Sequence, residues 1–349
     1  MGVETWVWVA TLIVLVGVLL ADLFVIGRRP HEPSVRESTL WVCLYVGLAV
    51  VFGLGIWVVS GPQYAGEFYA GWLTEYSLSV DNLFVFVIIM SRFAVPRQFQ
   101  QKVLMIGIVM ALLMRGLFIA LGAALISQFV WVFYIFGLFL LYTAVRLVSH
   151  GTTDESDFKE NVLIRVSRRV LRTSREYDSR AHFFTTMPDG KRMFSPLIIV
   201  MVAIGTTDLI FALDSIPAIF GLTKEPYIVF TANVFALMGL RQLYFLLGGL
   251  LDRLKYLSIG LAVVLAFIGV KLVFEALHSN NVPFINDGEP IKAVPEISIA
   301  FSLAFIAITL AVTTVASLIS SRRDRKRAAR SALPSSTEDS PDRGLERRP

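Results

Sequence analysis

Long apolar stretches, each about 20 residues in length, recur along the chain between short polar segments. A stretch of that length crosses the ~30 Å hydrocarbon core of a membrane as an α-helix. The strict alternation of a transmembrane barrel is absent from these stretches. The pattern predicts an all-α polytopic membrane protein. Its nine predicted spans are 5–25, 39–60, 67–90, 103–126, 129–149, 195–220, 228–248, 256–276 and 297–319.

Composition supports this class. Of the 349 residues 55% are hydrophobic, and the mean hydropathy is +0.67. A chain this apolar has more hydrophobic surface than a soluble core can bury. It therefore belongs in a bilayer, and the sequence predicts the cell membrane as its location.

Lysine and arginine gather in every second loop. They cluster at 28–36, 92–102 and 159–192, and again at 322–327 after the last span. The intervening loops hold only Lys224 and Lys292. Because loops rich in Lys and Arg stay in the cytoplasm, the N-terminus is predicted outside the cell and the C-terminus inside.

Two polar segments interrupt or follow the spans: the cytoplasmic loop 150–194, which belongs to the predicted transmembrane domain of residues 1–320, and the tail after it. Residues 158–175 combine helical apolar spacing with many arginines, which fits either a helix on the anionic inner leaflet or a solvated charged linker helix. Asp189-Gly190, in the same cytoplasmic loop, is a dipeptide typical of hairpin turns. Residues 321–349 are predicted to be a basic, disordered cytoplasmic tail.

The membrane domain contains a predicted internal duplication. Residues 67–149 match residues 195–276, with the cytoplasmic loop 150–194 between them. The matching pieces are EYSLSVDN with DLIFALDS, ALLMR with ALMGLR, and TAVRLV with IGVKLV. Since each unit has an odd number of helices, the second copy must be inverted, as in many secondary transporters.

Two spans each carry a pair of acidic residues six positions apart: Glu75 and Asp81, and Asp208 and Asp214. A charged residue at the centre of a membrane helix costs about 2.5–3.5 kcal/mol on insertion scales, so it indicates a functional site. A purely structural role is the alternative, and recurrence in both copies argues against it. The two pairs are expected to face each other near the midplane.

Residues six apart lie about 240° apart around a helix, so an unbroken helix does not aim both carboxylates at one point. Pro217 removes an amide donor and frees the carbonyl of Leu213, and Ser215 adds a hydroxyl. Asn82 supplies a side-chain carbonyl in the first copy. Oxygen donors of this kind suit Mn, Mg or Ca. The predicted metal-ligating residues are Glu75, Asp81, Asn82, Asp208, Asp214 and Ser215.

Further residues are candidates for supporting this site. These are Asp22, Arg115, Asn233, Arg241 and Pro217. Arg115 and Arg241, near the middle of matching spans, fit either neutralising one carboxylate each or fixing helix register. Asp22 lies near a span end and fits contact with interfacial water equally well. Lys271 and Glu275, four apart near the outer end of a span, are interpreted as a surface pair.

The chain resembles the TerC family of integral membrane proteins, which includes the Alx-type proteins and belongs to the LysE transporter superfamily. The resemblance covers most of residues 15–276. It rests on DLFVIGRRPHEPSVRES at 22–38, EYSLSVDNLFVF at 75–86 and the long segment 206–247. It implies a role in manganese homeostasis, chiefly export, and a historical association with tellurite resistance. By resemblance, Asp81 and Asn82 match the family's first acidic motif, and Asp208 and Asp214 its second.

The sequence therefore predicts an exporter of divalent cations, with Mn(II) as substrate, that alternates access around midplane carboxylates and is coupled to protons. The alternative is a membrane scaffold of a tellurite- or stress-resistance assembly that recruits soluble cytoplasmic partners. An intramembrane aspartyl protease is disfavoured, because neither Asp81 nor Asp214 lies in a G-x-G-D setting. No enzymatic activity, prosthetic group or nucleic-acid partner is expected, and no P-loop is present.

Overall fold

The structure is a computed structural model that describes residues 2–27, 34–129, 131–150, 184–186, 192–247, 256–283, 285–291 and 293–331. The regular secondary structure of the described residues is α-helical apart from one short hairpin and one turn of 3-10 helix, Asn286–Gly288. The helices are α1 (Thr5–Gly27), α2 (Val35–Ser60), α3 (Pro62–Arg92), α4 (Arg97–Gln128), α5 (Val132–His150), α7 (Pro196–Phe220), α8 (Pro226–Leu237), α9 (Leu240–Leu247), α10 (Leu257–His278) and α11 (Ile299–Ser331). The predicted class, an all-α polytopic membrane protein, is confirmed.

Each predicted span has a helix at its place. Within the described residues, eight stretches are long and apolar enough to cross a membrane. The apolar part of α1 found there, Thr5–Ala21, is shorter. The count of nine spans therefore stays a prediction.

Local sequence explains where several helices begin. The Ser34 hydroxyl accepts a hydrogen bond from the amide of Glu37 at 3.2 Å and so caps α2. Gly61 separates α2 from α3 with a φ of +97°, a conformation that glycine adopts freely. Pro62 and Pro196 follow as first residues of α3 and α7, where a missing amide hydrogen is harmless.

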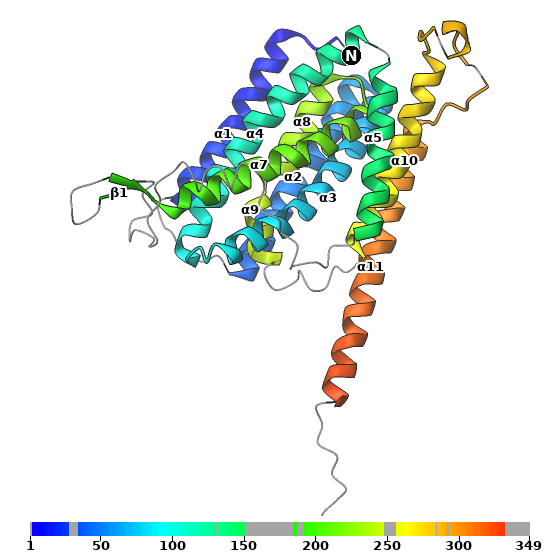
Figure 1. Cartoon of the computed structure of the whole chain (residues 1–349). Helices are drawn as coiled ribbons and strands as arrows, with labels where there is room; N and C mark the ends of the chain where they lie inside the picture. The colour runs from blue at the N-terminus through cyan, green and yellow to red at the C-terminus, as the bar shows by residue number, and fades with distance from the viewer. Residues whose placement is uncertain are drawn as a thin grey trace, which may run out of the picture.

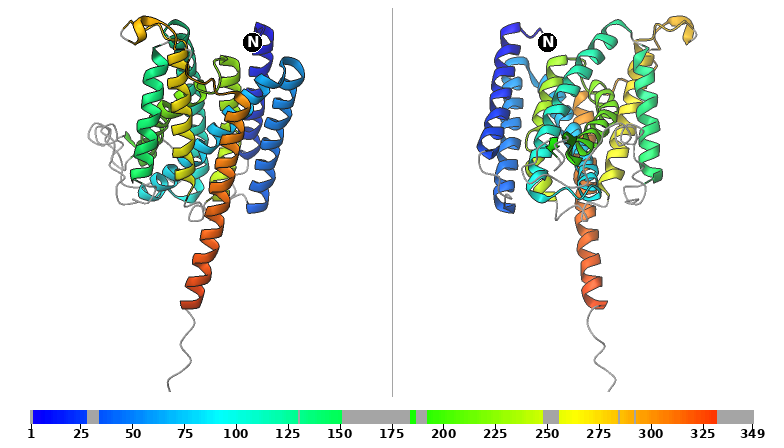
Figure 2. Two further views of the ribbon diagram at one scale, coloured as in Figure 1. Left: turned by 90° about the vertical axis from the view of Figure 1, so that its right-hand side faces the viewer. Right: turned by 60° about the vertical axis from the view of Figure 1, so that its left-hand side comes forward.

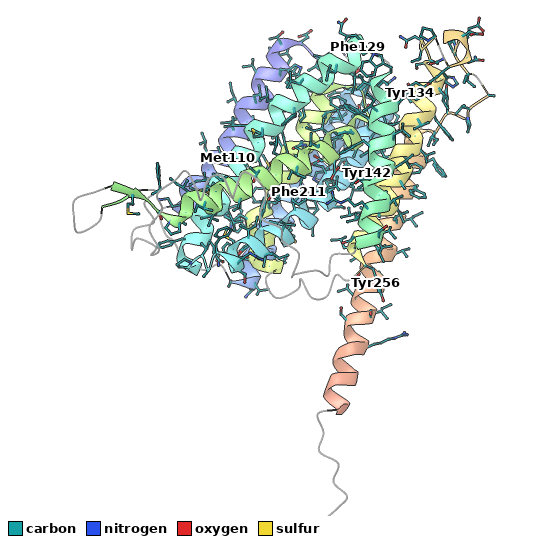
Figure 3. The ribbon with its side chains drawn as sticks, viewed as in Figure 1. Met110, Phe129, Tyr134, Tyr142, Phe211 and Tyr256 are labelled. Carbon is teal, nitrogen blue, oxygen red and sulfur yellow. The ribbon has the colours of Figure 1, made fainter. Side chains whose placement is uncertain are left out.

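The helices form a bundle in which α3, α4, α7 and α8 pack on one another at the centre (Figure 1). Helices α1 and α2 lie at one edge, and α5 and α10 at the opposite edge (Figure 2). Apolar side chains on the outside face away from the bundle, such as Tyr142 at 63% exposed (Figure 3). Such exposure suits a surface covered by lipid.

Small residues allow some of these helices to approach closely. A Cβ atom at Gly137 of α5 would lie 2.9 Å from the carbonyl oxygen of Gly269 in α10, and one at Gly269 would lie 2.9 Å from that of Gly137. In α7, a Cβ atom at Gly205 would collide with Met110 of α4, a residue labelled in Figure 3. Close contact through glycine is a common way for membrane helices to associate.

Helix contacts follow the pattern that the predicted duplication requires. In the predicted duplication α3 corresponds to α7, and α4 corresponds to α8. A contact between α3 and α8 therefore requires an equivalent contact between α7 and α4, and both contacts exist. The two remaining counterparts, α5 and α10, pack on each other. The inverted repeat itself stays a prediction.

The seventh predicted span, 228–248, is not one helix. It divides into α8 and α9 at Met238 and Gly239, where Gly239 has a φ of +81° and Tyr45 of α2 packs against it. Only glycine adopts this backbone conformation without strain. The apolar pattern continues through the break, so hydropathy alone predicts one span here. Discontinuous helices of this kind often occur near transporter binding sites.

Other expectations concern the ends of the chain and the cytoplasmic loop. Helix α11 continues to Ser331 (Figure 2), so the prediction of a disordered tail from 321 is wrong for residues 321–331. Their sequence, SRRDRKRAARS, is rich in good helix formers, which explains the difference. Strands β1 (Phe184–Thr186) and β2 (Arg192–Phe194) pair antiparallel around Asp189-Gly190, as that dipeptide predicts. The predicted membrane-surface segment 158–175 lies outside the described residues.

Candidate functional site

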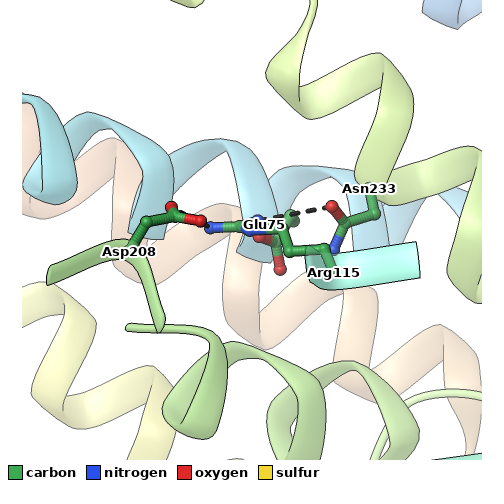
Figure 4. A network of polar contacts seen from close by, with 4 residues as sticks. All are labelled: Glu75, Arg115, Asp208 and Asn233. Atoms are coloured by element: carbon green, nitrogen blue, oxygen red, sulfur yellow. Dashed lines mark hydrogen bonds and ion pairs between the residues drawn. The ribbon is translucent and has the colours of Figure 1, made fainter. Parts of the chain in front are cut away.

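Charged residues meet in the middle of the bundle. Arg115 of α4 forms an ion pair with Glu75 of α3, and each side chain is only 1% exposed (Figure 4). The other guanidinium nitrogen, Nη2, lies 3.8 Å from Oδ1 of Asp208 in α7, whose side chain is 6% exposed. One arginine therefore holds a carboxylate from each half of the predicted duplication.

Two amide side chains complete this group. Arg115 Nη1 donates a hydrogen bond to Oδ1 of Asn233 in α8 at 3.4 Å. Asn82 lies seven residues after Glu75, on the same face of α3. With its amide oriented so that the nitrogen donates to the Leu78 carbonyl at 3.0 Å, its oxygen accepts from Arg115 Nη2 at 3.2 Å. Glu75, Asn82, Arg115, Asp208 and Asn233 are called the central cluster below.

The central cluster is buried, and its charges do not balance. Two carboxylates face one guanidinium, a formal charge of −1. Oδ2 of Asp208 and Nδ2 of Asn233 have no hydrogen-bond partner within the described structure. Removing one partner from a buried ion pair typically destabilises a protein by about 3–5 kcal/mol. An arrangement this costly to disturb, with a carboxylate oxygen still unpartnered, is typical of an ion-binding site.

Asp214 does not join the central cluster. Its Oδ1 accepts a hydrogen bond from the Thr143 hydroxyl of α5 at 3.1 Å. Helix α7 runs from Pro196 to Phe220 as one element, so Asp208 and Asp214 point to different neighbours. The nearly 240° between these two positions on one continuous helix is the physical reason. The role of Asp214 as a metal ligand stays a prediction.

The remaining predicted residues are distributed around this centre. Ser215 is 1% exposed, and its hydroxyl has no hydrogen-bond partner in the described structure. Pro217 lies inside α7 close to the helix end, and the side chain of Leu213 is 49% exposed, facing out of the bundle. A role for the Leu213 carbonyl in binding a cation stays a prediction. Arg241 is buried in α9, where it borders a small pocket with Tyr45.

The described side chains form no group of three or more His, Cys, Asp or Glu residues arranged to hold a metal ion. The side chains of Asp22 and Asp81 lie outside the described part of the structure, so neither predicted role is tested. The candidate site therefore consists of carboxylate and amide oxygens that already contact Arg115. These are the hard donors that Mn, Mg and Ca prefer.

A second polar site was not predicted. A cavity of about 330 Å³ is bordered by Glu67 of α3, Thr223 and Lys224 in the loop after α7, and Lys271 and Glu275 of α10. It is called the Glu67 cavity below. Glu67 accepts hydrogen bonds from the Thr223 hydroxyl at 2.5 Å and the Gln63 amide at 3.3 Å. The signal in the sequence was an acidic residue at the very start of a predicted span.

The Glu67 cavity also shows a partner of Glu275 that the sequence did not suggest. Glu275 forms an ion pair with Lys224, whose Nζ lies 2.5 Å from Glu275 Oε1. Lys224 Nζ also lies 5.1 Å from the centre of the Phe133 ring, a cation–π contact. This ion pair joins residues 51 positions apart in the sequence, a contact that helical spacing does not suggest.

Comparison with known proteins identifies relatives. The sequence profile described as the integral membrane protein TerC family matches residues 60–325. An uncharacterized membrane protein of Mycobacterium tuberculosis strain H37Rv is 49% identical over 306 residues, covering 87% of this chain and 76% of the relative. The putative membrane-bound redox modulator Alx of Escherichia coli K12 is 41% identical over 272 residues, covering 74% and 83% respectively. No solved structure matches the chain.

Proposed function

Because the chain belongs to the integral membrane protein TerC family, we propose that it exports divalent metal cations, with Mn(II) as its substrate. The cation passes through the central cluster by alternating access, with the N-terminus outside the cell and the C-terminus in the cytoplasm. Export from the cytoplasm places the protein in the cell membrane.

One observation carries this proposal: carboxylates from the two halves of the predicted duplication converge on one buried point. Glu75 comes from α3 and Asp208 from α7, and both reach Arg115. Transporters with inverted repeats bind substrate near the midplane, where the two repeats meet. A helix break lies in the same region of the chain, since α8 supplies Asn233 and ends at Leu237.

Ligand chemistry supports a hard divalent cation. Carboxylate and amide oxygens suit Mn(II), Mg(II) and Ca(II), whereas Cu(I) and Zn(II) favour thiolate and imidazole. The four histidines and the single cysteine of the sequence are not among the cluster residues. Mn(II) is proposed ahead of the other two cations because of the family resemblance.

Charge also supports coupling to protons. The two carboxylates of Glu75 and Asp208 and the guanidinium of Arg115 carry a formal charge of −1 together, and a bound divalent cation would bring this sum to +1. When the cation leaves, a proton on one carboxylate restores neutrality in the dry interior, where an unbalanced charge is costly. This balance supports exchange of the divalent cation for a proton.

Flux measurements test the proposal. Purified protein in vesicles should move Mn(II), measured with an enclosed metal-sensitive dye, and a pH gradient should change the rate. Glu75→Gln and Asp208→Asn should each abolish flux, because both keep the size of the side chain and remove its charge. Glu275→Gln, which removes a carboxylate from the rim of the Glu67 cavity, is the matched control and should retain flux.

The scaffold alternative makes the opposite prediction. The Alx relative is named as a putative redox modulator, and a scaffold acts through its cytoplasmic loop and tail. Cells would then keep their tolerance of tellurite or manganese with Glu75→Gln and Asp208→Asn, and lose it on deletion of 321–349. Two results together would favour the scaffold over the transporter. These are the absence of Mn(II), Mg(II) and Ca(II) flux in vesicles and the tolerance pattern just described.

A further inference from the structure

The guanidinium of Arg115 contacts every part of the proposed cation site. Its Nη1 atom pairs with the Glu75 carboxylate and donates to the Asn233 oxygen. Its Nη2 atom faces the Asp208 carboxylate at 3.8 Å and the Asn82 oxygen at 3.2 Å. Each terminal nitrogen thus takes one carboxylate and one amide oxygen, and the group lies between α3, α7 and α8 (Figure 4).

From this geometry, and resting on the proposed function, we propose that Arg115 is a built-in cation that occupies the substrate site and is displaced when the divalent cation binds. The guanidinium and the metal ion compete for the same oxygens. In this structure the guanidinium holds these oxygens.

The number and type of oxygens support competition. Glu75 and Asp208 have two carboxylate oxygens each, and Asn82 and Asn233 add one amide oxygen each. These six oxygens are the number that an octahedral Mn(II) or Mg(II) ion accepts. Asp208 Oδ2 is buried without a hydrogen-bond partner in the described structure, so one oxygen ligand for the metal ion is already available.

Arginine suits this role better than lysine. Its planar guanidinium presents several donors in a fixed fork, so it can hold two carboxylates and two amides from three helices at once. It also keeps its charge in a buried site. When the metal ion leaves, this side chain can return and keep the two carboxylates from facing each other unpaired. A resting state without substrate then stays stable.

A fixed structural pin is the alternative role for Arg115. A pin stabilises the fold and does not compete with the substrate, so its removal weakens the protein and brings no gain in metal affinity. A built-in competitor predicts tighter metal binding once its charge is gone. Affinity for Mn(II) therefore separates the two roles, and stability alone does not.

Mn(II) binding to the purified full-length protein is the decisive measurement, followed through the electron paramagnetic resonance signal of free Mn(II). Arg115→Gln should lower the Kd at least tenfold relative to wild type, because the charge leaves and a polar side chain stays. Arg115→Lys keeps the positive charge, and its Kd for Mn(II) should lie between those of the wild type and Arg115→Gln. Lys224→Gln removes one positive charge from the Glu67 cavity and should leave the Kd unchanged.

A second comparison removes the dependence on folding of the single variant. The double variant Glu75→Gln/Arg115→Gln loses one negative and one positive charge, so its net charge equals that of the wild type. It should bind Mn(II) at least tenfold more tightly than Glu75→Gln, in which Arg115 still faces Asp208. Equal or weaker binding in both comparisons would overturn the competition. The variants without Arg115 could bind Mn(II) more tightly while the wild-type protein in vesicles shows no Mn(II) flux. That result would reject export but would support competition between Arg115 and the metal ion.

Discussion

The central cluster and the Glu67 cavity each combine carboxylates with basic side chains, but in different surroundings. Arg115 and Glu75 are 1% exposed, packed among four helices. Lys224 and Glu275 are 53% and 39% exposed at the border of a cavity of about 330 Å³. A cavity of that size has room for water beside these side chains. One set of charges is therefore dry and the other is wet.

This difference decides what each charged pair can do. In water, an ion pair contributes about 0–1 kcal/mol, because solvent and salt screen it. In a dry interior, each partner depends on the other, and loss of one leaves a charge that nothing solvates. A dry cluster can therefore discriminate between an arginine and a metal ion as partners for its carboxylates. The wet cavity offers no comparable selectivity.

The largest expected effect is in the central cluster. Arg115→Met should lower the free energy of unfolding by about 3–5 kcal/mol, because it leaves the Glu75 and Asp208 carboxylates buried without a cation. Unfolding in detergent, followed by circular dichroism, measures the change. Adding Glu75→Gln to Arg115→Met should restore part of the loss. If Arg115→Met destabilises no more than Lys224→Met, the central cluster is not dry and the contrast fails.

An intermediate effect is expected at Glu67. Its carboxylate is 8% exposed and accepts hydrogen bonds from Thr223 and Gln63. Glu67→Ala leaves the buried Thr223 hydroxyl without its acceptor and should destabilise by about 1–3 kcal/mol. Thr223→Val in the same background should add little, because the two residues share one interaction. Additive losses would show that the hydrogen bond carries no stability.

Much of the fold could be predicted from the sequence, because a membrane requires long apolar helices and their length is fixed by its thickness. Glu75, Asp208 and Arg115 were also found, since a buried charge in such a helix is conspicuous. Spacing alone could not tell whether Asp208 or Asp214 turns toward Arg115. For Asp214, contact with Thr143 decided, and that contact depends on how α5 packs on α7.

Other features were beyond the sequence because they depend on residues far apart in the chain. The break at Gly239 depends on Tyr45 of α2 packing where the chain turns. The Glu67 cavity depends on a loop that brings Thr223 across 156 positions to Glu67. Apolar periodicity contains no signal for either, since the hydrophobic pattern is the same for a continuous and a broken helix.

The smallest expected effect concerns Lys224 and Glu275. Both side chains are partly exposed, so the coupling free energy from a double-mutant cycle with Lys224→Met and Glu275→Gln should be at most about 1 kcal/mol. Salt should reduce it further, since the Debye length falls from about 10 Å at 0.1 M to about 3 Å at 1 M. The cation–π contact with Phe133 is less sensitive to screening, so Lys224→Met should keep a small residual effect at high salt that Phe133→Leu removes. The same cycle on Arg115 and Glu75 should give a coupling several times larger that hardly changes with salt. Similar coupling free energies and similar salt dependence at the two sites would mean that water reaches both. The central cluster would then be hydrated, and the proposed competition between arginine and metal, which requires a water-free site, would have no basis.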